Sequence, residues 1–313
     1  MEPLSLPTLP PRDPKGHKGT FGAVAVVGGC ATESARMLGA PALAARGAIR
    51  AGAGLARIAA PRPLLDHLLL AAPFATGVAI PVDEAGEVLA HEASAIIDAL
   101  MRESQCLVIG PGLGVGEGPR AASLRAVQQD EVPVIVDADA INNLTQVPEL
   151  SRDFRAPVVL TPHPGEFRRL AAALRITIEP RDFASREAAA EALAQRLGCI
   201  IVLKGAGTVV SDGQRTWTCG HGHPCLATGG TGDVLAGIIA GLVAQYVGIR
   251  VHPKLPANPS RPLDLFDAAR IGVQAHALAG EAWARMHSAE AGLLPNELAD
   301  SLPSILSAMV ART

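Results

Sequence analysis

Apolar residues in this chain occur in short continuous runs separated by stretches with helical spacing. The run FGAVAVVGG at 21–29 contains no charged residue and ends in glycine. Continuous apolar runs are typical of parallel strands that are buried on both faces, whereas half-exposed strands alternate apolar and polar positions. Strands of the buried kind are predicted at 21–29, 54–60, 105–110, 132–136, 156–160 and 199–203.

Helices are predicted between these strands. The stretch 36–51 is rich in alanine and carries Pro41 near its start, where a helix tolerates proline. Further helices are expected at 62–71, 91–102, 119–129, 181–197, 263–285 and 296–311, and a hairpin is expected around Asp212-Gly213. The alternation predicts an α/β fold, a three-layer α/β/α sandwich with a mostly parallel central sheet.

The organisation along the chain is simple. Residues 1–18 are rich in proline and predict an extended N-terminal leader, and residues 19–313 are expected to form a single domain. The proline-rich stretch 248–262 is interpreted as a loop insertion in that domain.

The stretch GHPCLATGGTGDVLAGIIAGLVAQ at 222–245 combines a glycine-rich loop with an apolar helix, and Asp233 lies where they join. A helix N-terminus offers free N–H groups to a phosphate, and glycine lets the backbone approach it closely. Asp233 would repel a phosphate unless it takes part in the chemistry, so the loop points to phosphoryl transfer. Small residues, from Ala236 to Ala244, recur along the helix at three- and four-residue steps and predict close packing on the sheet.

Composition excludes several classes of protein. Apolar residues make up 49% of the 313 residues, and charged residues 18%, which is enough for a large buried core. A net charge of -3 gives no electrostatic basis for binding nucleic acid or an anionic membrane. The sequence has neither a signal-peptide pattern nor an apolar run long enough to span a bilayer, so a cytoplasmic location is expected. With 3% aromatic residues, a nucleotide base would be held mostly by backbone and aliphatic contacts.

The five cysteines are odd in number and form no CxxC pair. Cys106 and Cys199 lie beside predicted strands and are interpreted as small core residues. Cys219 and Cys225 flank two histidines, which leaves a metal site open there, although the spacing matches no common zinc pattern.

Four predicted strands end in short motifs: GPGLG at 110–114, DADA at 137–140, TPHPGE at 161–166 and KGAGT at 204–208. Ligands of open α/β sheets bind beyond the carboxyl ends of strands, so these motifs and the Asp233 loop are expected to line one crevice.

Each motif alone also has a structural interpretation. GPGLG is typical of a tight turn, Asp137 and Asp139 are candidates for helix capping, and capping is favoured for Asp139. His163 lies between two prolines, and structural and functional roles are equally supported. Lys204 alone is more typical of an exposed lysine, and the GHKGTFG segment at 16–22 either positions a phosphate or forms a turn.

Taken together and in this order, the motifs resemble the NAD(P)H-hydrate dehydratase family of the ribokinase-like fold. The resemblance rests on HKGTFGAVAVVGG at 17–29, LGAPALAARGAIRAGAGL at 38–55, VIGPGLG at 108–114, VIVDADAINNL at 134–144, LTPHPGEF at 160–167, IIVLKGAGTVV at 200–210, LATGGTGDVLAGIIAGLVAQ at 226–245 and, more weakly, GLLPNELADSLP at 292–303. The chain departs from the family in having His223-Pro224-Cys225 where an Asn/Gly-rich turn is usual, and in a long 248–262 segment.

The resemblance implies an ADP- or ATP-dependent lyase that repairs hydrated NADH and NADPH. Such an enzyme phosphorylates the ring hydroxyl of the hydrate and then eliminates phosphate. Asp233 matches the catalytic base, and Gly230, Thr231 and Gly232 match the anion hole.

The resemblance also assigns binding residues. The positions matching the nucleotide site are Lys204, Gly205, Ala206, Gly207, Thr208 and Gly232, and those matching the hydrate site are Ala40 or Pro41, Gly114, His163 and Asp233. Mg²⁺ would bridge the nucleotide oxygens, and Glu166 is expected to hold one of its waters.

Relatives imply a homo-oligomer, a tetramer, and a separate NAD(P)H-hydrate epimerase as functional partner, since no epimerase domain is expected in this chain. ADP is favoured over ATP, while the preference between NADH hydrate and NADPH hydrate stays open. Two alternatives are a kinase of the same fold acting on a vitamin precursor and a non-enzymatic nucleotide-binding module. The intact GGTGD sequence at 229–233 argues against the second.

Overall fold

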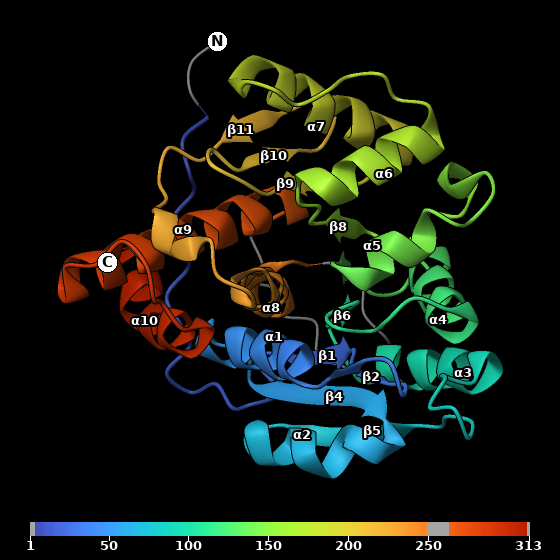
Figure 1. The fold of residues 1–313 in the computed structure, drawn as a ribbon. Coiled ribbons are helices and arrows are strands. Elements are labelled where there is room, and N and C mark those ends of the chain that lie inside the picture. Colours follow the sequence, from blue (N-terminus) through green and yellow to red (C-terminus); the bar gives the residue numbers. More distant parts are fainter. Residues whose placement is uncertain (1–3, 249–262, 312–313) are drawn as a thin grey trace.

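A sheet of nine strands runs through the middle of the protein (Figure 1), whose computed structural model describes residues 4–248 and 263–311. The strands are β1 Ala23–Val27, β4 Leu55–Pro61, β5 Thr76–Ile80, β6 Cys106–Ile109, β7 Val134–Val136, β8 Val158–Leu160, β9 Ile200–Leu203, β10 Val209–Ser211 and β11 Thr216–Thr218. Their order is β11-β10-β9-β8-β7-β6-β1-β4-β5. Among the described strands of this sheet, β10 alone runs in the opposite direction to the rest, so the predicted mostly parallel sheet is confirmed.

Helices cover both faces of the sheet (Figure 1). They are α1 Gly39–Arg50, α2 Leu65–Ala71, α3 Ala90–Met101, α4 Glu117–Gln128, α5 Asp139–Leu144, α6 Pro164–Leu174, α7 Phe183–Leu197, α8 Thr231–Tyr246, α9 Leu265–His287 and α10 Pro295–Ala308, with short 3₁₀ helices η1 Arg62–Leu64, η2 Leu150–Arg152 and η3 Pro224–Leu226. Because side chains alternate along a strand, Val24 and Val26 join the core under α1, α8 and α9, whereas Ala25 and Val27 join the core under α3 to α7. The three predicted layers are confirmed.

The sequence interpretation missed three strands. Edge strand β5 is half exposed and contains Gly77, so it has no continuous apolar run. The helix expected from residue 36 is wrong at its start, since β3 Arg36–Met37 pairs with β2 Cys30–Ala31 and α1 begins only at Gly39. Thr32 closes this small hairpin by accepting a hydrogen bond from Ala35 N–H.

The small residues of α8 make a different contact from the one predicted. A Cβ atom on Gly237 would lie 2.0 Å from the carbonyl oxygen of Ala44, and one on Gly241 would lie 2.6 Å from that of Ala48. These glycines therefore face α1 rather than the sheet, and Gly47 of α1 approaches Val234 in return. This helix pair fixes where the N-terminus of α8 points.

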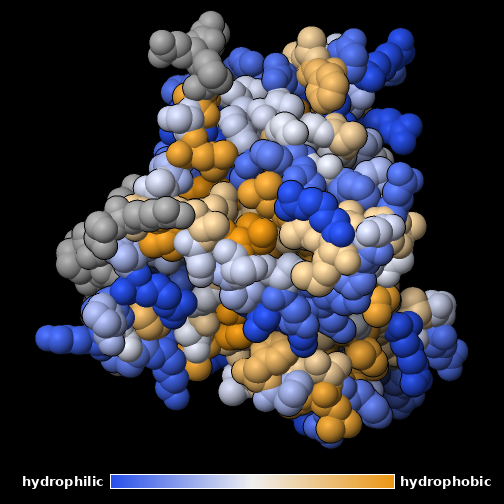
Figure 2. All heavy atoms as spheres, turned by 90° about the vertical axis from the view of Figure 1, so that its left-hand side faces the viewer, coloured by the Kyte–Doolittle hydropathy of each residue, from blue (hydrophilic) through white to orange (hydrophobic). Residues whose placement is uncertain are grey.

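The two ends of the described chain meet at the surface. Leu9 N–H donates to the carbonyl of Met309, and Ala311 N–H donates to that of Leu9, which leaves Leu9 almost fully buried. The predicted 248–262 loop lies, apart from residue 248, outside the described residues. Polar side chains cover most of the face on which α9 and α10 lie, and apolar ones form separate small patches (Figure 2). Within the described residues, every helix is too short or too polar to cross a membrane.

Candidate active site

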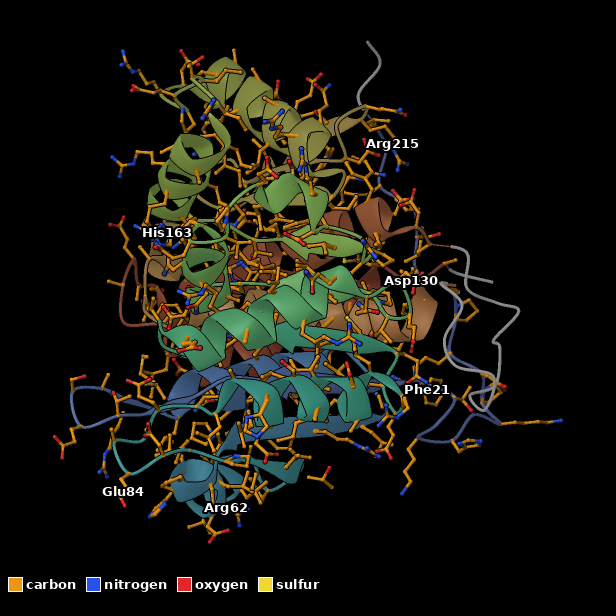
Figure 3. The ribbon with its side chains drawn as sticks, turned by 90° about the vertical axis from the view of Figure 1, so that its right-hand side faces the viewer. Phe21, Arg62, Glu84, Asp130, His163 and Arg215 are labelled. Carbon is orange, nitrogen blue, oxygen red and sulfur yellow. The ribbon has the colours of Figure 1, made fainter. Side chains whose placement is uncertain are left out.

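The predicted strand-end motifs come together on one side of the sheet. In Figure 3, His163 and Glu84, which follow strands, lie on the opposite side from Phe21 and Asp130, which precede strands. Asp137 follows β7, His163 follows β8 and Lys204 follows β9, and these three strands are neighbours in the sheet. Parallel strands therefore bring these residues to a common edge, as the sequence predicted.

An ion pair joins two of these strand ends. Lys204 Nζ lies 2.7 Å from Asp137 Oδ1 and 4.0 Å from Glu166 Oε2. The hydroxyl of Thr161 also donates to Asp137 Oδ1, at 2.7 Å. Burial alone would lower the pKa of Lys204, but the carboxylates of Asp137 and Glu166 outweigh burial and raise it. Lys204 is therefore a positively charged side chain fixed by ion pairs, and not the exposed lysine that its sequence context alone favoured.

Asp233 lies in the first turn of α8, next to this cluster. Burial, followed by the negative charge of Asp137, raises the pKa of Asp233 from 3.8 to about 7, although Lys204 acts in the opposite direction. A carboxylate with this pKa is partly ionised near neutral pH, which suits a general base.

His163 and Glu166 form the start of α6. His163 Nδ1 accepts hydrogen bonds from the N–H groups of Gly165, at 2.9 Å, and Glu166, at 3.4 Å, while Glu166 Oε2 accepts from His163 N–H at 2.7 Å. Because Nδ1 accepts, the neutral ring carries its proton on Nε2, which lies 3.3 Å from Glu166 Oε1. His163 thus caps the helix, and its ring stays half exposed for a ligand.

Glu166 is almost fully buried inside this cap. Burial raises the pKa of Glu166 to about 7, with Lys204 opposing and Asp137 adding to the shift. Two carboxyl groups with raised pKa values therefore share the vicinity of Lys204. Strongly shifted groups in a crevice are typical of functional sites.

The glycine loop before α8 presents free donors to this crevice. Gly230 adopts φ +95°, a left-handed conformation that glycine accepts without strain. The N–H and hydroxyl of Thr231 donate within the loop, to carbonyls of Thr228 and Leu226, whereas the N–H groups of Gly230 and Gly232 make no hydrogen bond within the described part of the chain. Thr231 therefore shapes the expected anion hole, and the two glycines offer donors to it.

His276 of α9 ties this loop to its surroundings. Its Nε2 lies 3.0 Å from the Thr231 carbonyl oxygen, which can only accept, so Nε2 carries the proton. Burial lowers the pKa of His276 to about 4, and the ring is therefore neutral at physiological pH.

A cavity of about 730 Å³ opens between the KGAGT segment at 204–208 and the 218–227 loop. Gly232, Leu235 and His276 are among its lining residues, and Phe183 is the one Phe, Tyr or Trp in its described lining, which also includes His221 and His223. Its size suits a nucleotide. The prediction that base stacking contributes little stays a prediction.

Four of the residues expected to contact the hydrate are not among those that line this cavity: Ala40, Pro41, Gly114 and His163. Ala40, at the start of α1, packs against the 110–114 turn, since a Cβ atom on Gly112 would lie 3.3 Å from its Cβ atom. Pro41 packs against Gly28, where a Cβ atom would lie 3.3 Å from that of Pro41. Gly114 borders a second cavity of about 180 Å³. The predicted contacts with a hydrated dinucleotide remain predictions.

Asp139 does not cap α5 as predicted. Ala138 occupies the N-cap position without a side-chain hydrogen bond, and Asp139 Oδ2 instead accepts from Gly114 N–H at 2.9 Å. Asp139 therefore fixes the 110–114 turn.

No group of three or more His, Cys, Asp or Glu side chains in residues 4–248 and 263–311 is arranged to hold a metal ion. All five cysteines are buried, and Cys225 Sγ donates to the carbonyl of Gly280, so these residues belong to the core. The carboxylates around Lys204 are nevertheless the hard oxygen ligands that Mg²⁺ prefers, and Mg²⁺ is usually bound through one or two carboxylates together with substrate phosphates.

Sequence reasoning missed one residue of this site and left another open. Asp137 was an open candidate for capping, and its position directly after a buried strand was the available signal. His276, in the middle of α9, gave no signal because it resembles an ordinary helix residue in the sequence.

The fold and the site define a ribokinase-like α/β protein with a nucleotide-sized cavity beside a glycine loop and a carboxylate. The family model described as NAD(P)H-hydrate dehydratase matches residues 24–304. The chain belongs to this family.

Individual relatives agree. The chain is 35% identical to the bifunctional NAD(P)H-hydrate repair enzyme Nnr of Thermofilum pendens, over 96% of this chain and 53% of that protein. It is 34% identical to the ADP-dependent (S)-NAD(P)H-hydrate dehydratase of Xanthomonas campestris, over 94% and 91%. The crystal structure of the ADP/ATP-dependent NAD(P)H-hydrate dehydratase from Bacillus subtilis, co-crystallised with ATP/Mg²⁺, is similar with a TM-score of 0.73 and 30% identity, over 98% and 99%. The chain spans about half the length of the bifunctional relatives.

Proposed function

We propose that this protein is an ADP-dependent (S)-NAD(P)H-hydrate dehydratase. The observation that carries the proposal is Asp233, a carboxyl group with a pKa of about 7 in the first turn of α8, where the neighbouring Gly232 lines the nucleotide-sized cavity. Family membership supports the choice of substrate.

The chemistry proceeds in two steps. Asp233 takes the proton of the hydrate hydroxyl while its oxygen attacks the terminal phosphorus of ADP, and AMP leaves. The carbon–oxygen bond then breaks with its electrons going to phosphate, and loss of a proton from the neighbouring ring carbon restores the double bond. Phosphorylation is needed because hydroxide is a poor leaving group.

The remaining residues bind and orient. The glycine donors at the start of α8 face the charge on the transferring phosphoryl group, and Lys204 to Thr208 border the nucleotide cavity. Ala40 or Pro41, Gly114 and His163 are the proposed hydrate contacts. Glu166 would help to hold Mg²⁺ through a water molecule, and the bound ion would supply charge neutralisation at the phosphates. A cytoplasmic homotetramer working with an NAD(P)H-hydrate epimerase completes the proposal.

The test is direct. The protein is incubated with NADPH hydrate, Mg²⁺ and either ADP or ATP, while NADPH absorbance and released phosphate are followed. We expect equal amounts of NADPH and phosphate, formed faster with ADP. No recovery of absorbance with either nucleotide contradicts the proposal, and a stable phosphorylated alcohol formed from a vitamin precursor instead identifies a kinase.

A further inference from the structure

Arg186 of α7 lies against the start of the KGAGT segment at 204–208, which lines the nucleotide-sized cavity. Its side chain is buried, with 9% of the residue exposed. Its Nη2 donates to the carbonyl oxygens of Leu203, at 3.1 Å, and Lys204, at 3.2 Å. A Cβ atom on Gly205 would lie 2.9 Å from the same nitrogen, so the guanidinium group packs against the bare backbone of this glycine.

No carboxylate balances this charge within the described residues. Three arginines have a buried Nε without a hydrogen-bond partner in that part of the chain: Arg46, Arg186 and Arg270. Arg46 pairs with Asp300 and Arg270 with Asp267, whereas Arg186 bonds only to carbonyls. Burial lowers the pKa of Arg186, but a guanidinium group stays protonated in proteins.

Around the proposed reaction centre, by contrast, carboxyl groups outnumber the positive charge. Lys204 faces the carboxylates of Asp137 and Glu166, and Asp233 adds a third carboxyl group to the cluster. Lys204 therefore has little positive charge left for a phosphate. An unpaired buried cation is costly, and an anion bound above it removes that cost.

We propose that Arg186 is a positioning residue that supplies the positive charge for the phosphates of the nucleotide. It acts through the backbone of Gly205, which borders the cavity. The charge makes the site select nucleoside diphosphates and triphosphates over the uncharged nucleoside. This inference rests on the proposed function only in taking the cavity as the nucleotide site.

The experiment compares the binding of adenosine, AMP and ADP by calorimetry, together with thermal unfolding. Arg186→Gln keeps hydrogen-bond donors without the charge, and Arg186→Lys keeps the charge. Arg196→Gln removes an exposed arginine from the same helix and is the matched control. We expect Arg186→Gln to weaken ADP binding by roughly ten-fold or more relative to adenosine, as expected for a charge close to the phosphates in a partly screened site. Arg186→Lys and Arg196→Gln should keep the wild-type ratio of the two affinities.

Equal weakening of ADP and adenosine binding by Arg186→Gln would show a purely structural role and overturn the inference. If Arg186→Gln does not fold, the pH dependence of ADP binding by Arg186→Lys tests the inference instead. A lysine without a carboxylate partner deprotonates as pH rises, so its preference for ADP should fall between about pH 7.5 and 9.5, whereas wild type stays constant. Lys204 keeps its proton there because its pKa is raised. A pH-independent preference in Arg186→Lys contradicts the inference, whereas failure of the wild type to bind ADP removes the proposed function itself.

Discussion

At the scale of single residues, Asp233 combines a burial cost with the proposed role of catalytic base. Its pKa of about 7 means that turnover should rise as pH increases through neutrality and the carboxylate forms. Asp233→Asn should lower kcat by roughly 10²–10⁴-fold, since a positioned base is lost. The measurement is NADPH formation from the hydrate with ADP, across pH.

The control for this variant is Asp66→Asn. Asp66 also lies in the first turn of a helix, α2, and it is exposed and outside the site. Both residues interact favourably with a helix dipole, which contributes about 0.3–1 kcal/mol. If Asp233→Asn retained as much turnover as Asp66→Asn, Asp233 would serve the dipole alone.

The same raised pKa predicts a stability effect. The folded protein holds a proton on Asp233 between about pH 4 and 7 that the unfolded chain, with a pKa near 3.8, releases. The folded state therefore binds more protons in this window, and stability falls as pH rises through it. Asp233→Asn should have a higher Tm than wild type at about pH 8 and the same Tm below about pH 4. A lower Tm at about pH 8 would contradict the assigned burial cost.

Asp137 should influence Asp233 without contacting substrate. Its charge raises the pKa of Asp233, so Asp137→Asn should move the acid limb of the pH–rate profile to lower pH. The variant also leaves the mostly buried Lys204 without its 2.7 Å partner, which should cost roughly 3–5 kcal/mol of stability. Thermal unfolding and the pH–rate profile measure the two effects, and an unmoved acid limb would exclude the electrostatic link.

Sequence reasoning found the site residues that stand in conspicuous motifs. Lys204, His163 and Glu166 converge as expected because parallel strands end at a common edge. The sequence did not show whether Asp137 or Asp139 pairs with Lys204, since the two aspartates are only two positions apart in the same motif. The strand end points Asp137 at Lys204, and the start of α5 points Asp139 at Gly114.

At the scale of elements, the contact between α1 and α8 sets the position of the glycine loop. Gly237→Ala would place a Cβ atom 2.0 Å from the Ala44 carbonyl oxygen, so α8 must shift. Such overpacking costs about 1–3 kcal/mol. We expect a lower Tm and, because Asp233 lies one turn away on the same helix, a lower kcat.

Gly39→Ala is the control, since a Cβ atom there meets nothing within 4 Å. It should leave the Tm unchanged or raise it slightly. Unchanged stability of Gly237→Ala would mean that the helix contact is not close. The glycine pattern revealed the small face of α8, but its partner was hidden because α1 lies almost 200 residues earlier in the chain.

Strand prediction from continuous apolar runs succeeded in the interior of the sheet and failed at its edge. Buried strands such as β6 are apolar on both faces. Edge strand β5 lacks that signal, because solvent tolerates polar and glycine residues there. The β2–β3 hairpin forms a separate sheet, and its strands of two residues each are too short for an apolar run.

At the scale of the whole molecule, the proline-rich N-terminal segment contributes a side chain, that of Leu9, to the core. Leu9 is 2% exposed, and its backbone is bonded to Met309 and Ala311 near the other end of the chain. Leu9→Ala should cost about 2–5 kcal/mol by leaving a cavity, which lowers the Tm by roughly 5–15 °C in a protein of this size. Leu4→Ala, which removes a side chain that is 40% exposed, should change the Tm little. Equal Tm values for the two variants would mean that the N-terminal segment is detached in solution. A selective loss in Leu9→Ala would show that both chain ends stabilise the fold holding the site.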